Sequence, residues 1–349
     1  MSKSPNAQTK SSKRRYILLL SAIVLVIAGW SAAWFYGRSV LAEELDGQMR
    51  TLAQNGLDIS CADLTIAGYP FRYEVSCRNM RSLDRAGTSG SLQSLNAVAL
   101  IYNPRHIIFE AEAPAVVDAP LSGAAGEVSW ETARASVKFS QEALGDVDLV
   151  FQKPEAALED TVSAGVFAAE KAEIHLRSAP DQADALDGFL SVDGLQLQSI
   201  PQLQDSVDFR GHVQISGGTA LLAGLDLVSL VRINGGELPV KLVLLEASLG
   251  DGSLGANGDL MVGGDGTLSG SINVTLANAD DLLRALKPLF PPNDSSFSVV
   301  EGVINSLKSA GEGSGDSSTV SVPVVLDRGL IKIGFLTLGQ IPPLFSAGI

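Results

Sequence analysis

The residues of this chain that could do chemistry are few, and its two cysteines are the first candidates. Cys61 and Cys77 flank the stretch "LTIAGYPFRYEVS", in which apolar and polar residues alternate on both sides of a Gly-Tyr-Pro turn. A three-residue turn there would place Cys61 opposite Cys77 on neighbouring antiparallel strands, within the Cα range that a disulfide tolerates. A catalytic dithiol normally has the C-x-x-C spacing, which this pair lacks. We therefore predict a structural disulfide between Cys61 and Cys77.

The three histidines are the next candidates, as metal ligands or as general bases. His106, His175 and His212 fall in separate strand-like segments, and none has an H-x-x-x-H or H-E-x-x-H companion in the sequence. We interpret each of them as an ordinary strand residue and predict no metal site.

One glycine motif has the spacing of a phosphate-binding loop. The stretch "GDGSLG", Gly250 to Gly255, matches G-x-G-x-x-G, but it lies between two strand-like runs and no helix opens on it. A turn is the better interpretation, and the sequence contains no G-x-S-x-G elbow of a hydrolase. We nominate no catalytic or cofactor-binding residue, and we expect a protein that is not an enzyme.

The elements that would position these residues begin with a long apolar segment. Residues 16–36 carry no charge over 21 positions, and about 20 apolar residues in a helix span a 30 Å hydrocarbon core. The segment ends in aromatic residues, and five basic residues without any acid precede it. This asymmetry predicts a cytoplasmic N-terminus and an exported remainder. A cleaved signal peptide would have a shorter apolar region and a small-x-small cleavage site.

The pattern of the remaining chain suggests four segments. We predict a basic cytoplasmic tail over 1–15, a transmembrane helix over 16–36, an amphipathic helix over 37–56 and a β-rich domain over 57–349. In the amphipathic segment, apolar residues recur at three- and four-residue spacing, as in Leu41, Leu45 and Met49.

The β-rich domain consists of short alternating runs separated by glycine, asparagine, aspartate and proline. Period-two alternation with a turn every ten to fifteen residues or so favours a large antiparallel sheet. Helical patterns are rare, and one of them, "NADDLLRALKPLF", has Asn278 as its expected N-cap. The predicted fold class is thus mainly β: a large curved antiparallel sheet with a few helices, after one N-terminal transmembrane helix.

The charge and the hydropathy pattern of the chain limit the kinds of molecule it can bind. The formal net charge is −14, and the acidic excess lies in the part of the chain beyond the basic tail. Such a surface repels nucleic acid, which we exclude as a partner. Several strands carry apolar residues on one face and Ser, Thr, Asp or Gly on the other. That apolar face must either pack against another layer in a closed sandwich or form a groove for an apolar ligand, and the sequence leaves both open.

The order of these segments resembles a known bacterial family. The basic tail, the single membrane helix, the stretch Gly68-Tyr69-Pro70-Phe71-Arg72 within "GYPFRYEVSC" and the C-terminal run "RGLIKIGFLTLGQIPPL" are together similar to domain of unknown function 2125. That family is in turn broadly similar to AsmA-like envelope proteins, which are anchored in the inner membrane and carry a curved periplasmic β-sheet with an apolar groove. The resemblance implies phospholipid handling or outer-membrane homeostasis, and it supplies no catalytic residues.

Two functional hypotheses follow. The first is a single-pass protein of the inner membrane whose periplasmic domain binds or transfers a phospholipid or fatty acyl ligand in an apolar groove, without a cofactor. The alternative is a structural or scaffolding envelope protein with a closed β core that recruits protein partners. An enzyme acting on cell-wall or lipid substrates is a third class, for which the sequence shows no set of reactive residues.

Overall fold

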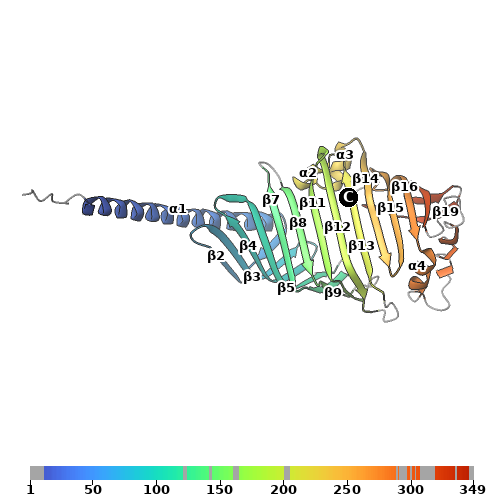
Figure 1. The fold of residues 1–349 in the computed structure, drawn as a ribbon, viewed down its shortest axis with the longest axis horizontal. Coiled ribbons are helices and arrows are strands. Elements are labelled where there is room, and N and C mark those ends of the chain that lie inside the picture. Colours follow the sequence, from blue (N-terminus) through green and yellow to red (C-terminus); the bar gives the residue numbers. More distant parts are fainter. Residues whose placement is uncertain are drawn as a thin grey trace, which may run out of the picture.

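Strands dominate the computed structural model of this chain, and they form one 19-stranded antiparallel sheet (Figure 1). The predicted fold class, a large antiparallel sheet after an apolar N-terminal helix, is confirmed. The structure describes residues 12–120, 124–140, 144–159, 165–199, 205–287, 290, 297–298, 301–302, 304–306, 319–334 and 336–345.

The N-terminal helix is longer than the predicted membrane segment. Helix α1 spans Ser12–Gln54, so the apolar segment and the amphipathic segment form one continuous helix. It is the one helix of the described residues long and apolar enough to cross a membrane. Its sheet-facing residues in the second half, Leu41, Leu45 and Met49, are half-buried at the spacing that the sequence shows.

The sheet begins beside α1 and extends away from it along the long axis of the molecule (Figure 1). Most neighbouring strands are also consecutive in the chain, as alternation with short turns favours. The strands are β1 Leu57–Ser60, β2 Asp63–Ala67, β3 Arg72–Asp84, β4 Ser89–Leu100, β5 Asn103–Ala119, β6 Ala124–Ser129, β7 Thr132–Phe139, β8 Leu144–Gln152, β9 Glu155–Leu158, β10 Gly165–Ala168, β11 Lys171–Ala179, β12 Gln182–Leu197, β13 Val207–Ile215, β14 Glu237–Leu249, β15 Gly252–Gly263, β16 Leu268–Ala277, β17 Thr319–Asp327, β18 Leu330–Ile333 and β19 Leu336–Gln340.

The register of the first hairpin differs from the predicted one. Leu64, and not Cys61, lies opposite Cys77, because the first pair of β2 with β3 is Ala67 with Glu74 and six residues, 68–73, lie between them. Both β1 and β2 pair with β3, so they form one edge strand that is interrupted at Cys61 and Ala62. The predicted three-residue turn was therefore wrong, although the predicted pair of cysteines is bonded.

Similar interruptions recur farther along the sheet. β6 is separated from β7, β8 from β9, and β10 from β11 by two residues each. Backbone hydrogen bonds continue across these gaps, from Lys153 N to Glu170 O at 2.9 Å and from Glu170 N to Asp193 O at 2.9 Å. The sheet thus stays hydrogen-bonded across these interruptions, and β9 lies at its lower margin in Figure 1.

Among the described elements, the short helices α2, α3 and α4 pack on the sheet away from α1 (Figure 1). Helices α2 (Thr219–Leu222) and α3 (Leu227–Ile233) connect β13 to β14 and form one cluster with Leu238 and Val262. Helix α4 (Ala279–Leu286) follows β16 and forms a second cluster with Leu249, Leu276 and Val322.

Asn278 occupies the predicted N-cap position of α4, but its side chain does not cap the helix. The Asn278 side-chain amide instead donates to the carbonyl of Asp251 at 2.8 Å. The two acidic residues of the first turn and Arg284 in the last turn have the charge distribution that the helix dipole favours.

Candidate functional site

The most extensive feature of the sheet is a face that carries apolar side chains on successive strands. The strand registers align one residue from each of thirteen strands into a single cross-strand row. This row contains Ile66, Val75, Ala97, Phe109, Ala135, Leu149, Ile174, Leu190, Gly211, Leu245, Ala256, Val274 and Val322.

Two further rows lie on the same face, two residues away on either side in most strands. One runs from Tyr73 through Ile107 and Leu176 to Val324, and the other runs from Leu64 through Phe151 to Leu276. We call the surface formed by the three rows the apolar face. It crosses the sheet from the strands beside α1 to β17.

A fourth row lies between the central row and the row that runs from Leu64 to Leu276. Its side chains point to the opposite face of the sheet and are mostly polar. It contains Thr65, Ser76, Asn96, Glu110, Arg134, Val150, Glu173, Ser191, Arg210, Glu246, Gly255, Thr275 and Ser321. We call this surface the polar face. Because side chains alternate along a strand, the contrast between the two faces follows directly from the alternating sequence.

The helices cover only parts of the apolar face within the described chain. Helices α2, α3 and α4 pack on parts of β12 to β17, and α1 lies over the first strands. Between these regions, Ile174 and Leu190 keep 36% and 38% of their surface exposed. A single-layer sheet that leaves such side chains accessible has an apolar surface for a further occupant.

The loop between β2 and β3 attaches α1 to the sheet at one end of the apolar face. It holds the predicted motif Gly68-Tyr69-Pro70-Phe71-Arg72, whose only predicted role was to form the turn. Trp34 is only 4% exposed and stacks on Tyr73, with ring centroids 5.5 Å apart. The Trp34 indole N–H donates to the carbonyl of Arg72 at 3.1 Å.

Further contacts join the same loop to the helix. The Trp30 indole N–H donates to the carbonyl of Pro70 at 2.9 Å, and the hydroxyl groups of Ser31 and Tyr69 lie 2.8 Å apart. Gly68 has φ +101°, where an added Cβ would come within 2.8 Å of the Arg72 backbone, so the turn requires glycine at this position. The motif therefore positions the helix on the first hairpin.

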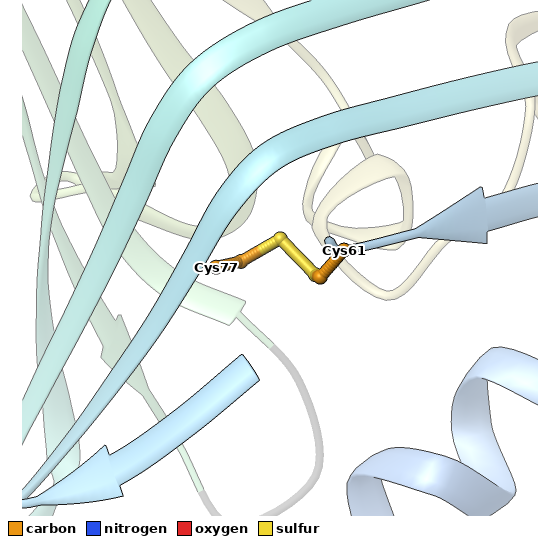
Figure 2. Close-up of a disulfide and its surroundings, with 2 residues drawn as sticks. All are labelled: Cys61 and Cys77. Carbon is orange, nitrogen blue, oxygen red and sulfur yellow. A yellow bond between two sulfur atoms is a disulfide. The ribbon is translucent and has the colours of Figure 1, made fainter. Parts of the chain in front are cut away.

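The disulfide lies next to this junction, at the interruption of the edge strand. Cys61 and Cys77 are bonded with their Cα atoms 5.4 Å apart, as the sequence predicted. Figure 2 shows Cys77 on a strand and Cys61 just beyond the end of another. Because Cys61 has left the regular ladder at that point, the bond holds β1 and β2 against β3 where backbone pairing is interrupted.

The three predicted histidines lie on the polar face in strands, and two of them have carboxylate partners. His175 Nδ1 lies 2.8 Å from Asp148 Oδ1, and His212 Nε2 lies 2.5 Å from Asp187 Oδ1. His106 Nε2 instead lies 2.9 Å from the Ser136 hydroxyl. Sequence spacing missed these pairs, because residues that lie 25 or 27 positions apart meet only through strand register.

The side chains around His175 and His212 form a shallow depression that carries charges of both signs. Its lining residues are Lys138, Asp146, Asp148, His175, Leu176, Arg177, Asp187, Phe189 and His212. They include no serine, threonine or cysteine that a histidine could activate. In the part of the chain that the structure describes, no group of three His, Cys, Asp or Glu residues is arranged to hold a metal ion.

The glycine motif lies where a turn was expected. Gly250 and Asp251 connect β14 to β15, and the rest of the motif belongs to β15, so no helix N-terminus faces it. The motif therefore lacks the geometry of a phosphate-binding loop.

Comparison with known proteins identifies one family. A family model described as "Uncharacterized protein conserved in bacteria (DUF2125)" matches residues 34–342, which is most of the chain. Searches of curated proteins and of solved structures each found no match. The matched range contains the whole β-sheet, both cysteines and the loop that contacts α1.

Proposed function

This chain belongs to the bacterial family DUF2125, and from its geometry we propose that it is a membrane-anchored protein of the cell envelope that binds lipid on its apolar face. The observation that carries this proposal is the set of three apolar rows across the sheet, with accessible side chains such as Ile174 and Leu190 in the middle. The protein acts by binding rather than by catalysis.

The apolar face suits an acyl chain better than a polar ligand. Most of its side chains are aliphatic or aromatic, so the gain on binding comes from apolar area removed from water. Each buried methylene contributes about 0.8 kcal/mol. A phospholipid or fatty acid with a long chain therefore gains several kcal/mol without any specific headgroup contact.

The position of α1 supports the same function. The charge-free half of this helix has the length of a membrane span, and its other half lies on the first strands of the sheet. The strands that carry the apolar face thus begin beside the helix and continue away from it along the molecule (Figure 1). By the positive-inside rule, the sheet lies in the periplasm and the helix in the inner membrane.

Lipid binding is tested by mass spectrometry of the full chain, purified in mild detergent. Native preparations should contain phospholipid or fatty acid, and delipidated preparations should take it up again from vesicles. If native preparations carry no lipid and delipidated ones take up none, the proposed binding is wrong.

Topology is tested separately. A reporter that is active only in the periplasm, fused after Ser199, should be active. An active cytoplasmic reporter at the same position would instead place the sheet in the cytoplasm and contradict the proposed location.

A further inference from the structure

Five exposed aromatic side chains surround the junction between α1 and the sheet. They are Trp30 and Phe35 on α1, Tyr69 and Phe71 in the loop between β2 and β3, and Tyr102 in the turn between β4 and β5. We call this group the aromatic collar. Its members are between 42% and 77% exposed, although tyrosine, tryptophan and phenylalanine of this size are usually largely buried.

The collar is one surface and not five separate residues. The rings of Trp30 and Phe71 lie 6.3 Å apart, and those of Phe35 and Tyr69 are stacked at 6.0 Å. The backbone N–H of Ile101 donates to the carbonyl of Phe71 at 3.1 Å, which brings the turn with Tyr102 to the same loop.

From this arrangement we infer that the aromatic collar is a membrane seat: the two hairpin tips lie in the interface of the bilayer that α1 crosses. The inference rests on the proposed function only in that α1 spans a membrane. It concerns where the sheet meets the lipid, and it does not require the apolar face to bind any.

The length of the charge-free segment of α1 sets the depth of the collar in the membrane. The basic tail ends at Arg15, so the charge-free segment begins at Tyr16. If Trp30 lay in water, residues 16–29 alone would span the membrane, and at 1.5 Å per residue they measure only about 21 Å against a hydrocarbon core of about 30 Å. Trp30 must therefore lie within the membrane boundary, and the loop that contacts it lies at the same depth.

The backbone of the loop between β2 and β3 is suited to the membrane interface. The carbonyl groups of Gly68, Pro70 and Phe71 each accept a hydrogen bond, from Arg72 N, Trp30 Nε1 and Ile101 N. Backbone groups that are satisfied internally can enter a membrane boundary at lower cost. Tryptophan and tyrosine are also enriched at headgroup level, where the apolar ring and the polar group are both accommodated.

The test places a fluorescent probe at the collar of the full chain in phospholipid vesicles. Tyr102→Cys is labelled with an NBD dye, and Ala86→Cys, in the turn between β3 and β4 at the other end of the same strands, is the matched control. The native cysteines are bonded to each other and do not react without reductant. Lipids with a doxyl group on the acyl chain should quench the probe at 102 about threefold more strongly than the probe at 86.

Two results would overturn the inference. Aqueous iodide that quenches the two probes equally, with no preference of the doxyl lipid for position 102, would place the collar in water. A probe at 102 that is shielded from both quenchers would indicate that the collar packs against a second protein chain.

A third labelled variant separates this inference from lipid binding by the apolar face. Ile174→Cys reports the middle of the face. Doxyl quenching at 102 but not at 174 would support the membrane seat and contradict the lipid site. Quenching at 174 but not at 102 would support the lipid site and contradict the membrane seat.

Discussion

Trp34 and Tyr73 bind each other in two ways: their rings stack at an interplanar angle of 22°, and the Tyr73 hydroxyl donates to the Trp34 carbonyl at 3.2 Å. This pair fixes a helix with a membrane-spanning length to the first hairpin of the sheet. The buried indole ring of Trp34 is therefore a central contact of the junction, beside the hydrogen bonds of Trp30 and Ser31 to the same loop.

Replacing this ring should loosen the junction. Trp34→Ala should lower the free energy of unfolding by about 3 to 5 kcal/mol, since a large buried aromatic side chain is removed. Trp34→Phe keeps a ring but loses the hydrogen bond to Arg72, so the loss should be about 1 kcal/mol. Pulse proteolysis in mild detergent measures both. Val40→Ala, at an exposed position on the same helix, is the control, and an equal effect there would contradict the assigned role.

The disulfide between Cys61 and Cys77 should contribute to the stability of the fold. The double variant Cys61→Ser and Cys77→Ser should unfold at lower denaturant, with a loss of about 3 kcal/mol at most, because the bond closes a short loop. Reductant should produce a similar loss in the native chain and none in the double variant. Unchanged stability in both cases would show that backbone pairing alone holds the first hairpin.

A charge in the middle of the apolar face should abolish lipid retention. Leu190→Glu places a carboxylate where an acyl chain would lie, and the bound lipid measured by mass spectrometry should fall severalfold. Ile108→Glu is the matched control, because Ile108 is 44% exposed on the polar face. If both variants retain lipid equally, the apolar face is not the binding surface.

The buried carboxylate on the polar face should matter for stability and not for lipid. The Asp187 side chain is only 8% exposed and lies against His212 and Arg177. Asp187→Ala should cost about 2 kcal/mol, because the partners lose a buried acceptor. Asp148→Ala removes a more exposed carboxylate beside His175 and should cost less, about 0.5 kcal/mol. Thermal unfolding measures both, and lower lipid retention in either would contradict the separation of the two faces.

Helix α3 should lose protection in acid. The Ser229 hydroxyl and the Ser229 backbone N–H both donate to the carboxylate of Asp226 at the N-cap. These two hydrogen bonds, the hydroxyl's more than the N–H's, lower the pKa of that carboxyl. A lowered pKa stabilises the fold above the ordinary aspartate range, and this contribution is lost as the pH falls through the folded-state pKa. Hydrogen exchange at Leu230 and Val231 should therefore show lower protection factors near pH 3 than at pH 6.

Asp226→Asn supplies the control for that measurement. Asparagine still accepts the N-cap hydrogen bond but does not titrate in this range. Its protection factors in α3 should change less with pH, and the same acid loss in this variant would assign the effect to another group.

Much of the fold could be predicted from local patterns. The charge-free run of residues 16–36 indicated the apolar helix, and period-two alternation indicated the sheet, because both patterns repeat within a few residues. The cysteine pair was also predictable from its short separation. Its register was not, because three more residues than expected lie between the first paired positions, Ala67 and Glu74, and only the packed loop sets that number.

The candidate site was less predictable. The sequence showed that strands had apolar and polar sides, but it could not show that these sides align into continuous rows, because alignment depends on the registers of a dozen strand pairs. It left open whether another layer covers the apolar side. It also gave no sign that Asp187 meets His212, since those residues lie on neighbouring strands 25 positions apart.

The sequence by itself determined the apolar helix, the strand-rich domain and the pair of cysteines, because hydropathy and short-range spacing act locally. Only the tertiary structure decided that the Gly-Tyr-Pro loop holds α1 through Trp30 and Trp34, and that the apolar sides of the strands form one surface. Those features depend on contacts between residues far apart in the chain, and such contacts form only when the registers and the packing of the whole sheet are set.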